Sequence, residues 1–257
     1  MTHDPRRAAF RVLHESGCFV LPNPWDVGSA DRLRRRGFKA LASTSAGMAW
    51  ALGRQDGEVT LDEVLDHLSM LCAATDLPVN ADFEAGFADA PDGVAENVAR
   101  AAATGIAGLS IEDRDGGALF DLKLAAERVK AARASLDDVA PDVVLVGRSE
   151  GFLLGDTDLD ATIARLVAYA EAGADCLYAP GVTDLGQIRA IVAAVAPKPV
   201  NVLLMGPEMR VADLEAAGVR RVSTGGALAA AAWAGFEDAV TILVEEGHMP
   251  PRRRPPA

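Results

Sequence analysis

The feature that most constrains the fold is a regular alternation of short apolar runs with longer amphipathic segments along 257 residues. Eight runs have the length and composition of buried parallel strands. They are Cys18–Pro22, Ala40–Ser45, Val79–Phe83, Gly108–Glu112, Val143–Arg148, Cys176–Ala179, Val200–Leu204 and Arg221–Thr224. Between them lie Ala- and Leu-rich stretches with helical periodicity, namely Val27–Arg36, Leu61–Thr75, Asp92–Thr104, Leu122–Leu136, Asp158–Ala172, Leu185–Ala196 and Met209–Ala217. Pro5–Ser16 precedes the first strand and Ala229–Glu246 follows the eighth.

Eight strands alternating with eight helices over about 250 residues predict a (β/α)8 TIM barrel, an α/β fold. A doubly wound sheet is the competitor, but it offers no obvious place for eight evenly spaced strands. We expect one barrel domain over residues 1–249 and a Pro/Arg-rich tail over residues 250–257 that is solvated and does not join the core.

The bulk composition excludes some classes of partner. A formal net charge of -12 argues against nucleic acid and against a membrane surface. No uninterrupted apolar run approaches the roughly 20 residues of a membrane span, and the chain opens without a signal peptide. The three cysteines lack metal-ligand spacing and suit reduced thiols. These features predict a cytoplasmic protein that acts on a small molecule.

Carboxylates follow two successive predicted strands. Asp82 and Glu84 come at the end of the third strand, and Glu112 and Asp113 come at the end of the fourth. Carboxylates are costly to bury unless they are paired, hydrogen-bonded or bound to a metal ion. The arrangement therefore predicts one shared site for a hard cation, which we take to be Mg²⁺. The alternative for each single acid is that it caps the following helix.

The other catalytic chemistries lack their residue. In a barrel, catalysis takes place at the carboxyl ends of the strands, and no histidine, lysine or cysteine falls at such an end. Arg148 and Tyr178 do, and we count both, together with Glu112 and Asp56, as catalytic candidates. A metal ion would act as a Lewis acid while Arg148 binds a carboxylate or a developing enolate. Two simpler roles stay open, because Arg148 could pair with Glu112 and Tyr178 could only pack.

Two further segments lie near the predicted mouth of the barrel. Small residues follow the second strand, and the backbone amides of Ser45, Ala46 and Gly47 would suit a substrate carboxylate. The same turn could simply lead into a helix. Trp25 follows the first strand and is counted with the substrate-binding candidates, although packing alone would also explain it.

Taken together, these residues resemble the isocitrate lyase/phosphoenolpyruvate mutase superfamily, and within it the carboxyphosphonoenolpyruvate phosphonomutase-like branch. The similarity covers most of the chain. It is carried by Leu21–Asp26, Thr44–Gly47, Asp82–Gly86, Ile111–Asp113, Gly147–Glu150 and Arg221–Gly226, in this order at successive strand ends. The resemblance implies a barrel whose last helix is exchanged between subunits of a homodimer or homotetramer. It also implies Mg²⁺, a 2-oxo or 2-hydroxy carboxylic acid, and cleavage of a C–C or C–P bond through an enolate-like species.

The resemblance also implies roles for individual residues. Ser45 and Gly47 would form the turn that binds the substrate carboxylate, and Arg148 would be the substrate-binding arginine. Asp56, in the loop after the second strand, would be the aspartate near the metal ion, while Asp82 and Glu112 would surround the ion.

Three departures from the family pattern narrow the reaction. Asn80-Ala81-Asp82 stands where Asp-Ala-Asp is usual, which weakens the metal site unless Glu84 compensates. The lid segment 114–120 is short and has no thiol, and Pro180 replaces the acid or histidine after the sixth strand. These changes speak against cleavage of isocitrate or methylisocitrate. They favour a Mg²⁺-dependent lyase that cleaves a C–C bond of a small 2-oxo acid, similar to an oxaloacetate decarboxylase. The alternatives are a C–P enzyme similar to phosphoenolpyruvate mutase or phosphonopyruvate hydrolase, and a 2-oxo-acid-binding protein with reduced turnover.

Overall fold

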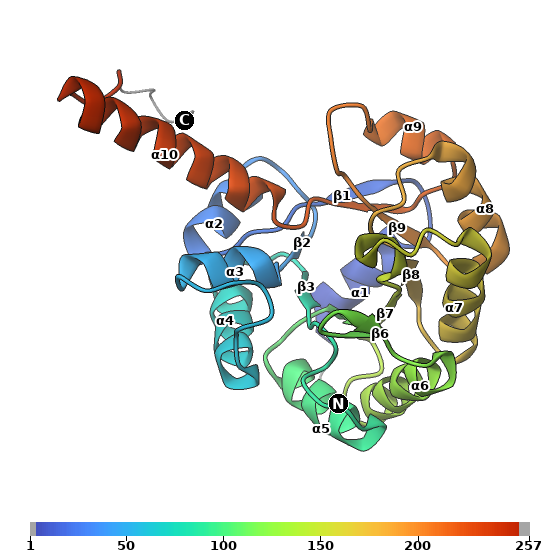
Figure 1. The fold of residues 1–257 in the computed structure, drawn as a ribbon. Coiled ribbons are helices and arrows are strands. Elements are labelled where there is room, and N and C mark those ends of the chain that lie inside the picture. Colours follow the sequence, from blue (N-terminus) through green and yellow to red (C-terminus); the bar gives the residue numbers. More distant parts are fainter. Residues whose placement is uncertain (1–3, 252–257) are drawn as a thin grey trace.

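The computed structural model describes residues 4–251, and at its centre eight parallel strands form a nearly closed barrel (Figure 1). The strands are β1 (Phe19–Leu21), β2 (Leu41–Ala42), β3 (Val79–Asp82), β4 (Gly108–Glu112), β7 (Val144–Arg148), β8 (Cys176–Tyr178), β9 (Val200–Leu203) and β10 (Arg221–Ser223). Their order in the sheet is β1-β10-β9-β8-β7-β4-β3-β2. Just beyond β1, the carbonyl of Pro22 accepts a hydrogen bond from the amide of Ala42 at 3.1 Å, which links the two outer strands. The predicted barrel is therefore confirmed.

Helices surround the strands (Figure 1). They are α1 (Pro5–Leu13), α2 (Val27–Arg35), α3 (Ser45–Ala51), α4 (Leu61–Ala74), α5 (Pro91–Ala103), α6 (Leu122–Val139), α7 (Leu159–Glu171), α8 (Leu185–Val195), α9 (Val211–Ala216) and α10 (Ala227–Glu246), with one 3₁₀ turn, η1 (Gly151–Leu154). Local signals fix several of the starts. Thr60 and Glu63 form a reciprocal capping box at α4, and Pro91 occupies the first turn of α5.

Two elements differ from the predicted pattern. The second strand was expected over Ala40–Ser45 but comprises only Leu41–Ala42, because Thr44 caps a helix, α3, that begins at Ser45. The segment after β4 is a small antiparallel hairpin of β5 (Arg114–Asp115) and β6 (Ala118–Leu119). Helix α3 and the strands of the hairpin are too short for a periodic pattern to appear in the sequence.

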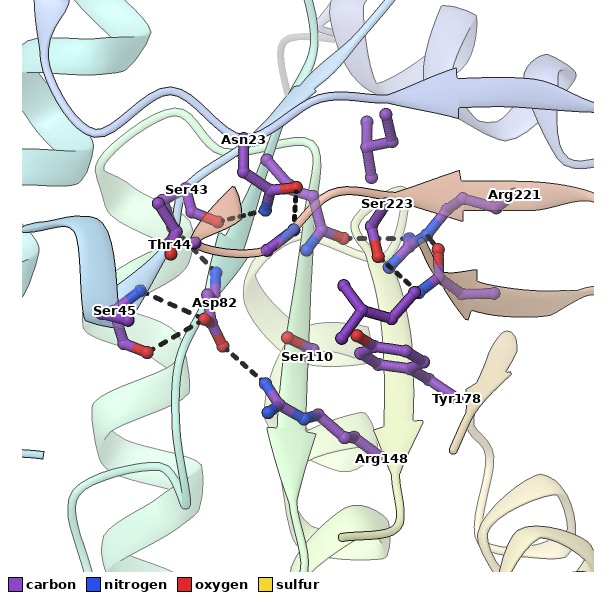
Figure 2. A pocket seen from close by; sticks show the side chains of 18 of the residues that line it. Asn23, Ser43, Thr44, Ser45, Asp82, Ser110, Arg148, Tyr178, Arg221 and Ser223 are labelled. Atoms are coloured by element: carbon purple, nitrogen blue, oxygen red, sulfur yellow. Dashed lines mark hydrogen bonds and ion pairs between the residues drawn. The ribbon is translucent and has the colours of Figure 1, made fainter. Parts of the chain in front are cut away.

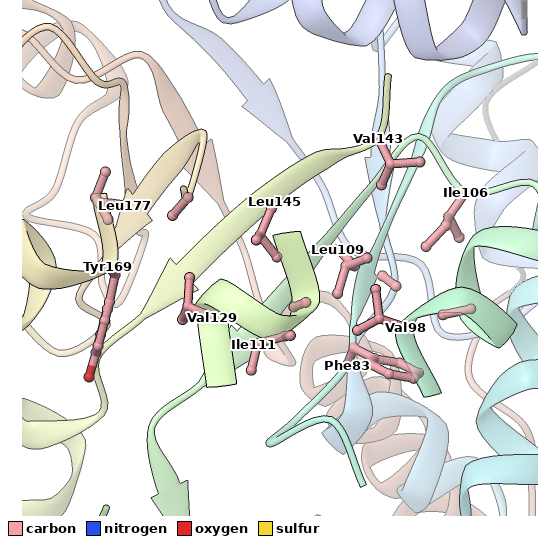
Figure 3. Packing of buried hydrophobic residues seen from close by; sticks show 14 of the residues in the cluster. Phe83, Val98, Ile106, Leu109, Ile111, Val129, Val143, Leu145, Tyr169 and Leu177 are labelled. Atoms are coloured by element: carbon pink, nitrogen blue, oxygen red, sulfur yellow. The ribbon is translucent and has the colours of Figure 1, made fainter. Parts of the chain in front are cut away.

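The core has two layers. The outer layer lies between the strands and the helices that cover them, and Phe83, Leu109 and Leu145 are fully buried in it (Figure 3). A second, smaller cluster contains side chains of the barrel interior together with Phe10 of α1. Phe10 is fully buried, and its ring packs edge-on against the ring of Phe19 at the start of β1. Helix α1 thus closes the amino-terminal end of the barrel and leaves the carboxyl end open to a ligand.

Helix α10 leaves the barrel and extends away from it (Figure 1). Ala229 is its one buried residue, whereas Trp233, Phe236 and Val244 are exposed. By length and composition alone α10 could cross a membrane, with a mean hydropathy of 1.5 over its most apolar window. This qualifies the expectation from the sequence, which considered uninterrupted apolar runs. The charged pair Glu237 and Asp238 lies in the middle of the helix, where burial in hydrocarbon is costly.

The domain boundary at residue 249 stays a prediction, and most of the expected tail, residues 252–257, lies outside the described residues.

Candidate active site

A cavity of about 140 Å³ opens at the carboxyl ends of the strands (Figure 2). Among the predicted site residues, Ser45, Ala46, Asp56, Asp82, Arg148 and Tyr178 line it. This volume is below the range of about 300–1,000 Å³ that holds drug-sized ligands. The cavity therefore suits a small metabolite.

Arg148 lies at the centre of a group of acidic side chains at the cavity mouth. Its guanidinium is 3.1 Å from Asp82 Oδ1 and 3.3 Å from Glu112 Oε2 and also donates to Glu150 Oε1. From the hairpin, Arg114 Nε donates to Glu112 Oε1 at 3.0 Å. We call these residues and Glu84 the mouth cluster; its members are Asp82, Glu84, Glu112, Arg114, Arg148 and Glu150. The predicted convergence of Asp82, Glu112 and Arg148 is observed.

The strand register creates the cluster. Glu112 is the Cα partner of Arg148 between β4 and β7, and Arg148 is the partner of Tyr178 between β7 and β8. In parallel strands, partners in register point to the same face of the sheet. Three side chains from separate strands therefore enter the barrel at one level, and the guanidinium of Arg148 lies 5.4 Å from the ring centre of Tyr178.

Asp82 is held at the start of helix α3. Both the backbone amide and the hydroxyl of Ser45 donate to Asp82 Oδ2 at 3.1 Å (Figure 2). The carboxylate that Ser45 binds is therefore the protein's own, the Gly47 amide donates to Thr44 Oγ1, and binding of a substrate carboxylate by this turn stays a prediction. The simpler interpretation of this turn, as the start of a helix, holds. Gly47 is needed for packing, because a Cβ there would lie 2.7 Å from a Thr44 carbon.

Glu84 is held in an unfavourable environment. Its backbone has a φ of +45°, which non-glycine residues rarely adopt, and such conformations cluster at functional sites. Its Oε1 is buried without a hydrogen-bond partner among the described residues. Burial raises the pKa of Glu84 to about 8, with further contributions from Asp82, Glu112 and Asp56. A cation beside this carboxylate would give Oε1 a partner and would lower the pKa of Glu84.

The mouth cluster contains more carboxyl groups than guanidinium groups. Burial, opposed by Arg148, raises the pKa of Glu112 to about 7. Burial also acts against the charge of Arg148, but Glu112, Glu150 and Asp82 keep its pKa well above the usual value. Four carboxylates face two guanidinium groups, so full ionisation leaves an excess of two negative charges. A divalent cation would balance them.

The residues present fit a magnesium ion in their chemistry, though not as a complete cage. Within residues 4–251, no three His, Cys, Asp or Glu side chains are arranged to hold a metal ion by themselves. Mg²⁺ usually keeps several waters and is bound by one or two carboxylates together with the substrate. Asp82, Glu84 and Glu112 supply oxygen donors of that kind.

The remaining predicted residues have different positions. Trp25, Gly47, Glu84 and Glu112 are absent from the described residues that line the cavity. Glu112 pairs with the lining residue Arg148, and Glu84 lines a separate pocket. Trp25 and Gly47 lie against each other, since a Cβ on Gly47 would be 2.9 Å from the Trp25 Cβ. Tyr178 lines the cavity, and burial raises its pKa to about 12, so the phenol keeps its proton at neutral pH. Asp113 binds the hydroxyl of Tyr169 at 2.5 Å and the amide of Glu150 at 2.8 Å, and so holds the turn after β7 in place.

Sequence reasoning missed the floor of the cavity, which is formed by Asn80, Asn201 and Arg221. Asn80, which stands where an acid is usual in the family, lines the same cavity as Asp82. Its side-chain oxygen accepts a hydrogen bond from Arg221 at 3.2 Å, deeper in the barrel. The sequence did offer one indication of this floor. Arg221 is a charged residue two positions before Ser223, so both point into the barrel, where uncharged residues are expected. Arg114 was also missed, because its contact depends on the hairpin.

Comparison with known proteins places this geometry among related sequences. Residues 10–244 match the family described as phosphoenolpyruvate phosphomutase. A crystal structure from Burkholderia cenocepacia is 46% identical, has a TM-score of 0.92, and covers 96% of this chain and 90% of that chain. Oxaloacetate decarboxylase of Pseudomonas aeruginosa is 32% identical over 87% of this chain and 80% of its own length. The structure of oxaloacetate acetylhydrolase with its product oxalate is 27% identical with a TM-score of 0.88, and it covers 96% of this chain and 89% of that chain.

Proposed function

Because this chain belongs to the phosphoenolpyruvate phosphomutase family, within the isocitrate lyase/phosphoenolpyruvate mutase superfamily, we propose that it is a Mg²⁺-dependent lyase that cleaves a C–C bond of a small 2-oxo dicarboxylate. Oxaloacetate is the leading candidate substrate, and the cytoplasm is the expected compartment. The observation that carries the proposal is the mouth cluster, in which the guanidinium of Arg148 and the carboxyl groups of Asp82, Glu84, Glu112 and Glu150 come together at the carboxyl end of the barrel. The related oxaloacetate decarboxylase supports the choice of substrate.

Asp82, Glu84 and Glu112 would hold the magnesium ion, which supplies a Lewis acid that stabilises negative charge on the 2-oxo oxygen. Arg148 would orient a substrate oxygen, because its charge stays fixed throughout the accessible pH range. Tyr178 would donate a hydrogen bond to charge that develops in the cavity, since its phenol stays protonated. Asp56 and Ala46, which line the same cavity, would contact the substrate from the α3 side.

The test is turnover of oxaloacetate and related 2-oxo and 2-hydroxy dicarboxylates by the purified protein, with Mg²⁺ and with EDTA. Products distinguish the two C–C cleavages, because loss of CO₂ from oxaloacetate yields pyruvate, whereas addition of water yields oxalate and acetate. Arg148→Met should lose activity, and Arg100→Met, which alters an exposed ion pair on α5, is the matched control. No metal-dependent turnover across the panel would refute the proposal.

A second candidate is cleavage or rearrangement of a C–P bond, which the family match itself favours. Phosphorus NMR of incubations with phosphonopyruvate and phosphoenolpyruvate separates it from C–C cleavage. Calorimetry that shows ligand binding without any product would instead indicate a binding protein.

We also expect a homodimer or homotetramer formed by exchange of α10. Trp233 and Phe236 are 40% and 54% exposed on this helix. Covering such apolar side chains with a partner subunit is favourable and stabilises the assembly. Size-exclusion chromatography with light scattering tests the oligomeric state. A monomer at micromolar concentration would contradict the expectation.

A further inference from the structure

Arg221 is a second arginine in the same cavity, and it is more deeply buried than Arg148. It begins strand β10, is 2% exposed, and lines the inner end of the cavity, toward the amino ends of the strands. Figure 2 shows its side chain extending from β10 toward the interior, beside Ser223 and Tyr178. A guanidinium in this position has left water and needs compensation for its charge.

That compensation is incomplete in the described part of the chain. Arg221 Nε donates to Asn201 Oδ1 at 3.0 Å, and one terminal nitrogen donates to Asn80 Oδ1 at 3.2 Å. Both acceptors are neutral amides, and a guanidinium has five N–H donors. Arg221 forms no ion pair with any of the residues that the structure describes.

The ionisable groups near Arg221 are also uncharged at neutral pH. Burial lowers the pKa of His14 to about 3, and its Nδ1 donates to the Phe10 carbonyl. Burial raises the pKa values of Cys176 and Tyr178, so the thiol and the phenol keep their protons. Burial lowers the pKa of Arg221, yet an arginine stays protonated under any physiological condition.

The two arginines of the cavity therefore differ in charge balance. Arg148 is surrounded by Asp82, Glu112 and Glu150, so its positive charge is already compensated. Arg221 presents a positive charge that no carboxylate of the described chain meets. Asn201 is oriented for this arrangement, since its amide nitrogen donates to Ser223 Oγ at 2.9 Å and leaves its oxygen for Arg221.

We propose that Arg221, fixed by Asn80 and Asn201, is an anion subsite at the floor of the cavity that binds one carboxylate of the substrate. The inference rests on the proposed function, and it explains why that substrate should carry two carboxylates. One carboxylate lies at the floor, and the rest of the substrate faces the mouth cluster. The narrow cavity admits a short dicarboxylate and leaves little room for a larger one.

The subsite also restricts which carboxylate binds there. A carboxylate that leaves as CO₂ loses its charge during the reaction, and a paired guanidinium would stabilise the ground state more than the transition state. Arg221 therefore binds a carboxylate that keeps its charge throughout. This holds for loss of CO₂ from the other end of the molecule and for cleavage by water.

The test is binding of malonate, a dicarboxylate without an oxo group, to the full-length protein with Mg²⁺ by calorimetry. Arg221→Met should weaken binding by roughly tenfold to a hundredfold, because hydrogen bonds to charged groups contribute that much to affinity. Arg221→Lys keeps the charge and should lose less. The matched control is Arg220→Met, since Arg220 is the preceding residue and its guanidinium donates to the Gly17 carbonyl at the surface.

Arg221→Met is expected to fold, because it removes the hydrogen bonds to two neutral amides, Asn80 and Asn201, and leaves no buried charge without its partner. If it does not fold, Arg221→Lys carries the comparison. Malonate binding that is equal in wild type and both Arg221 variants, or absent from wild type, would overturn the subsite. If the wild-type protein does not turn over oxaloacetate but malonate binding is weakened in the Arg221 variants as expected, the result would count against the proposed function alone.

Discussion

Replacing Arg148 with methionine tests the mouth cluster directly. The change removes the one guanidinium that contacts Asp82, Glu112 and Glu150 together. The side chain of Glu150 is fully buried and that of Glu112 is 7% exposed, so water cannot replace the lost partner. Removing one partner of a buried ion pair costs about 3–5 kcal/mol. Arg114 still pairs with both Glu112 and Glu150, which places the expected loss in the lower half of that range.

The assay is thermal unfolding without magnesium at pH 7.5. For a domain of about this size, 1 kcal/mol shifts Tm by about 2–4 °C, so a loss of about 3–4 kcal/mol in Arg148→Met should lower Tm by about 6–16 °C. The loss should shrink as pH falls, because protonation of the carboxylates removes the uncompensated charge. Magnesium should restore part of it, because the freed carboxylates can bind the ion.

The control is Arg100→Met, which breaks an ion pair whose two side chains are 45% and 80% exposed. Exposed pairs contribute about 0–1 kcal/mol, so this variant should melt close to wild type. Equal Tm values for the two variants would refute the argument that Arg148 compensates buried acids. A pH-independent loss in Arg148→Met would refute the electrostatic cause.

Three further predictions concern single side chains. The pKa of Glu84 is raised to about 8, so the folded protein keeps a proton that the unfolded chain releases near pH 4.5. The stability that this bound proton contributes is fully present below pH 4.5 and is lost as pH rises through about 8. Glu84→Gln should therefore flatten the fall of Tm between pH 5 and 8.5 measured in EDTA by about half or more, and an unchanged slope would contradict the assignment. Gly47→Ala should cost about 1–3 kcal/mol by urea denaturation, because its Cβ meets atoms within 3 Å, whereas Gly235→Ala on α10 meets none within 4 Å and should cost nothing; equal midpoints would exclude the packing argument. Tyr169→Phe removes the buried hydrogen bond to Asp113 and should cost about 1–3 kcal/mol in the same assay, and a wild-type midpoint would show that this bond adds no stability.

The barrel could be predicted because its signal is local. Each strand of the barrel is a short apolar run and each long helix an amphipathic one, and eight repeats leave few other folds. The errors occurred where elements were too short to show a periodic pattern, as in α3 and the hairpin after β4. The position of the acids at the strand ends could be predicted for the same reason, since a charged residue that follows a buried strand lies at the rim of the barrel.

The partners of those charges were not legible. Arg148 was expected to bind substrate or to pair with Glu112. In the structure it contacts three carboxylates, and two of them, Glu112 and Glu150, also pair with Arg114. Asn80 stands where the family usually has an acid, and the sequence did not show that it lines the same cavity as Asp82 and accepts a hydrogen bond from Arg221. Spacing along the chain carries no information about which of several rim residues touch.

By itself, the sequence determined the eightfold alternation, the end of the barrel that carries the chemistry, and the residue types available there. Tertiary structure alone decided that Glu112, Arg148 and Tyr178 share one level of the barrel and that Arg221 lies beneath them without a carboxylate. The physical reason is that periodicity depends on neighbours within a segment, whereas charge balance depends on the register between strands far apart in the chain.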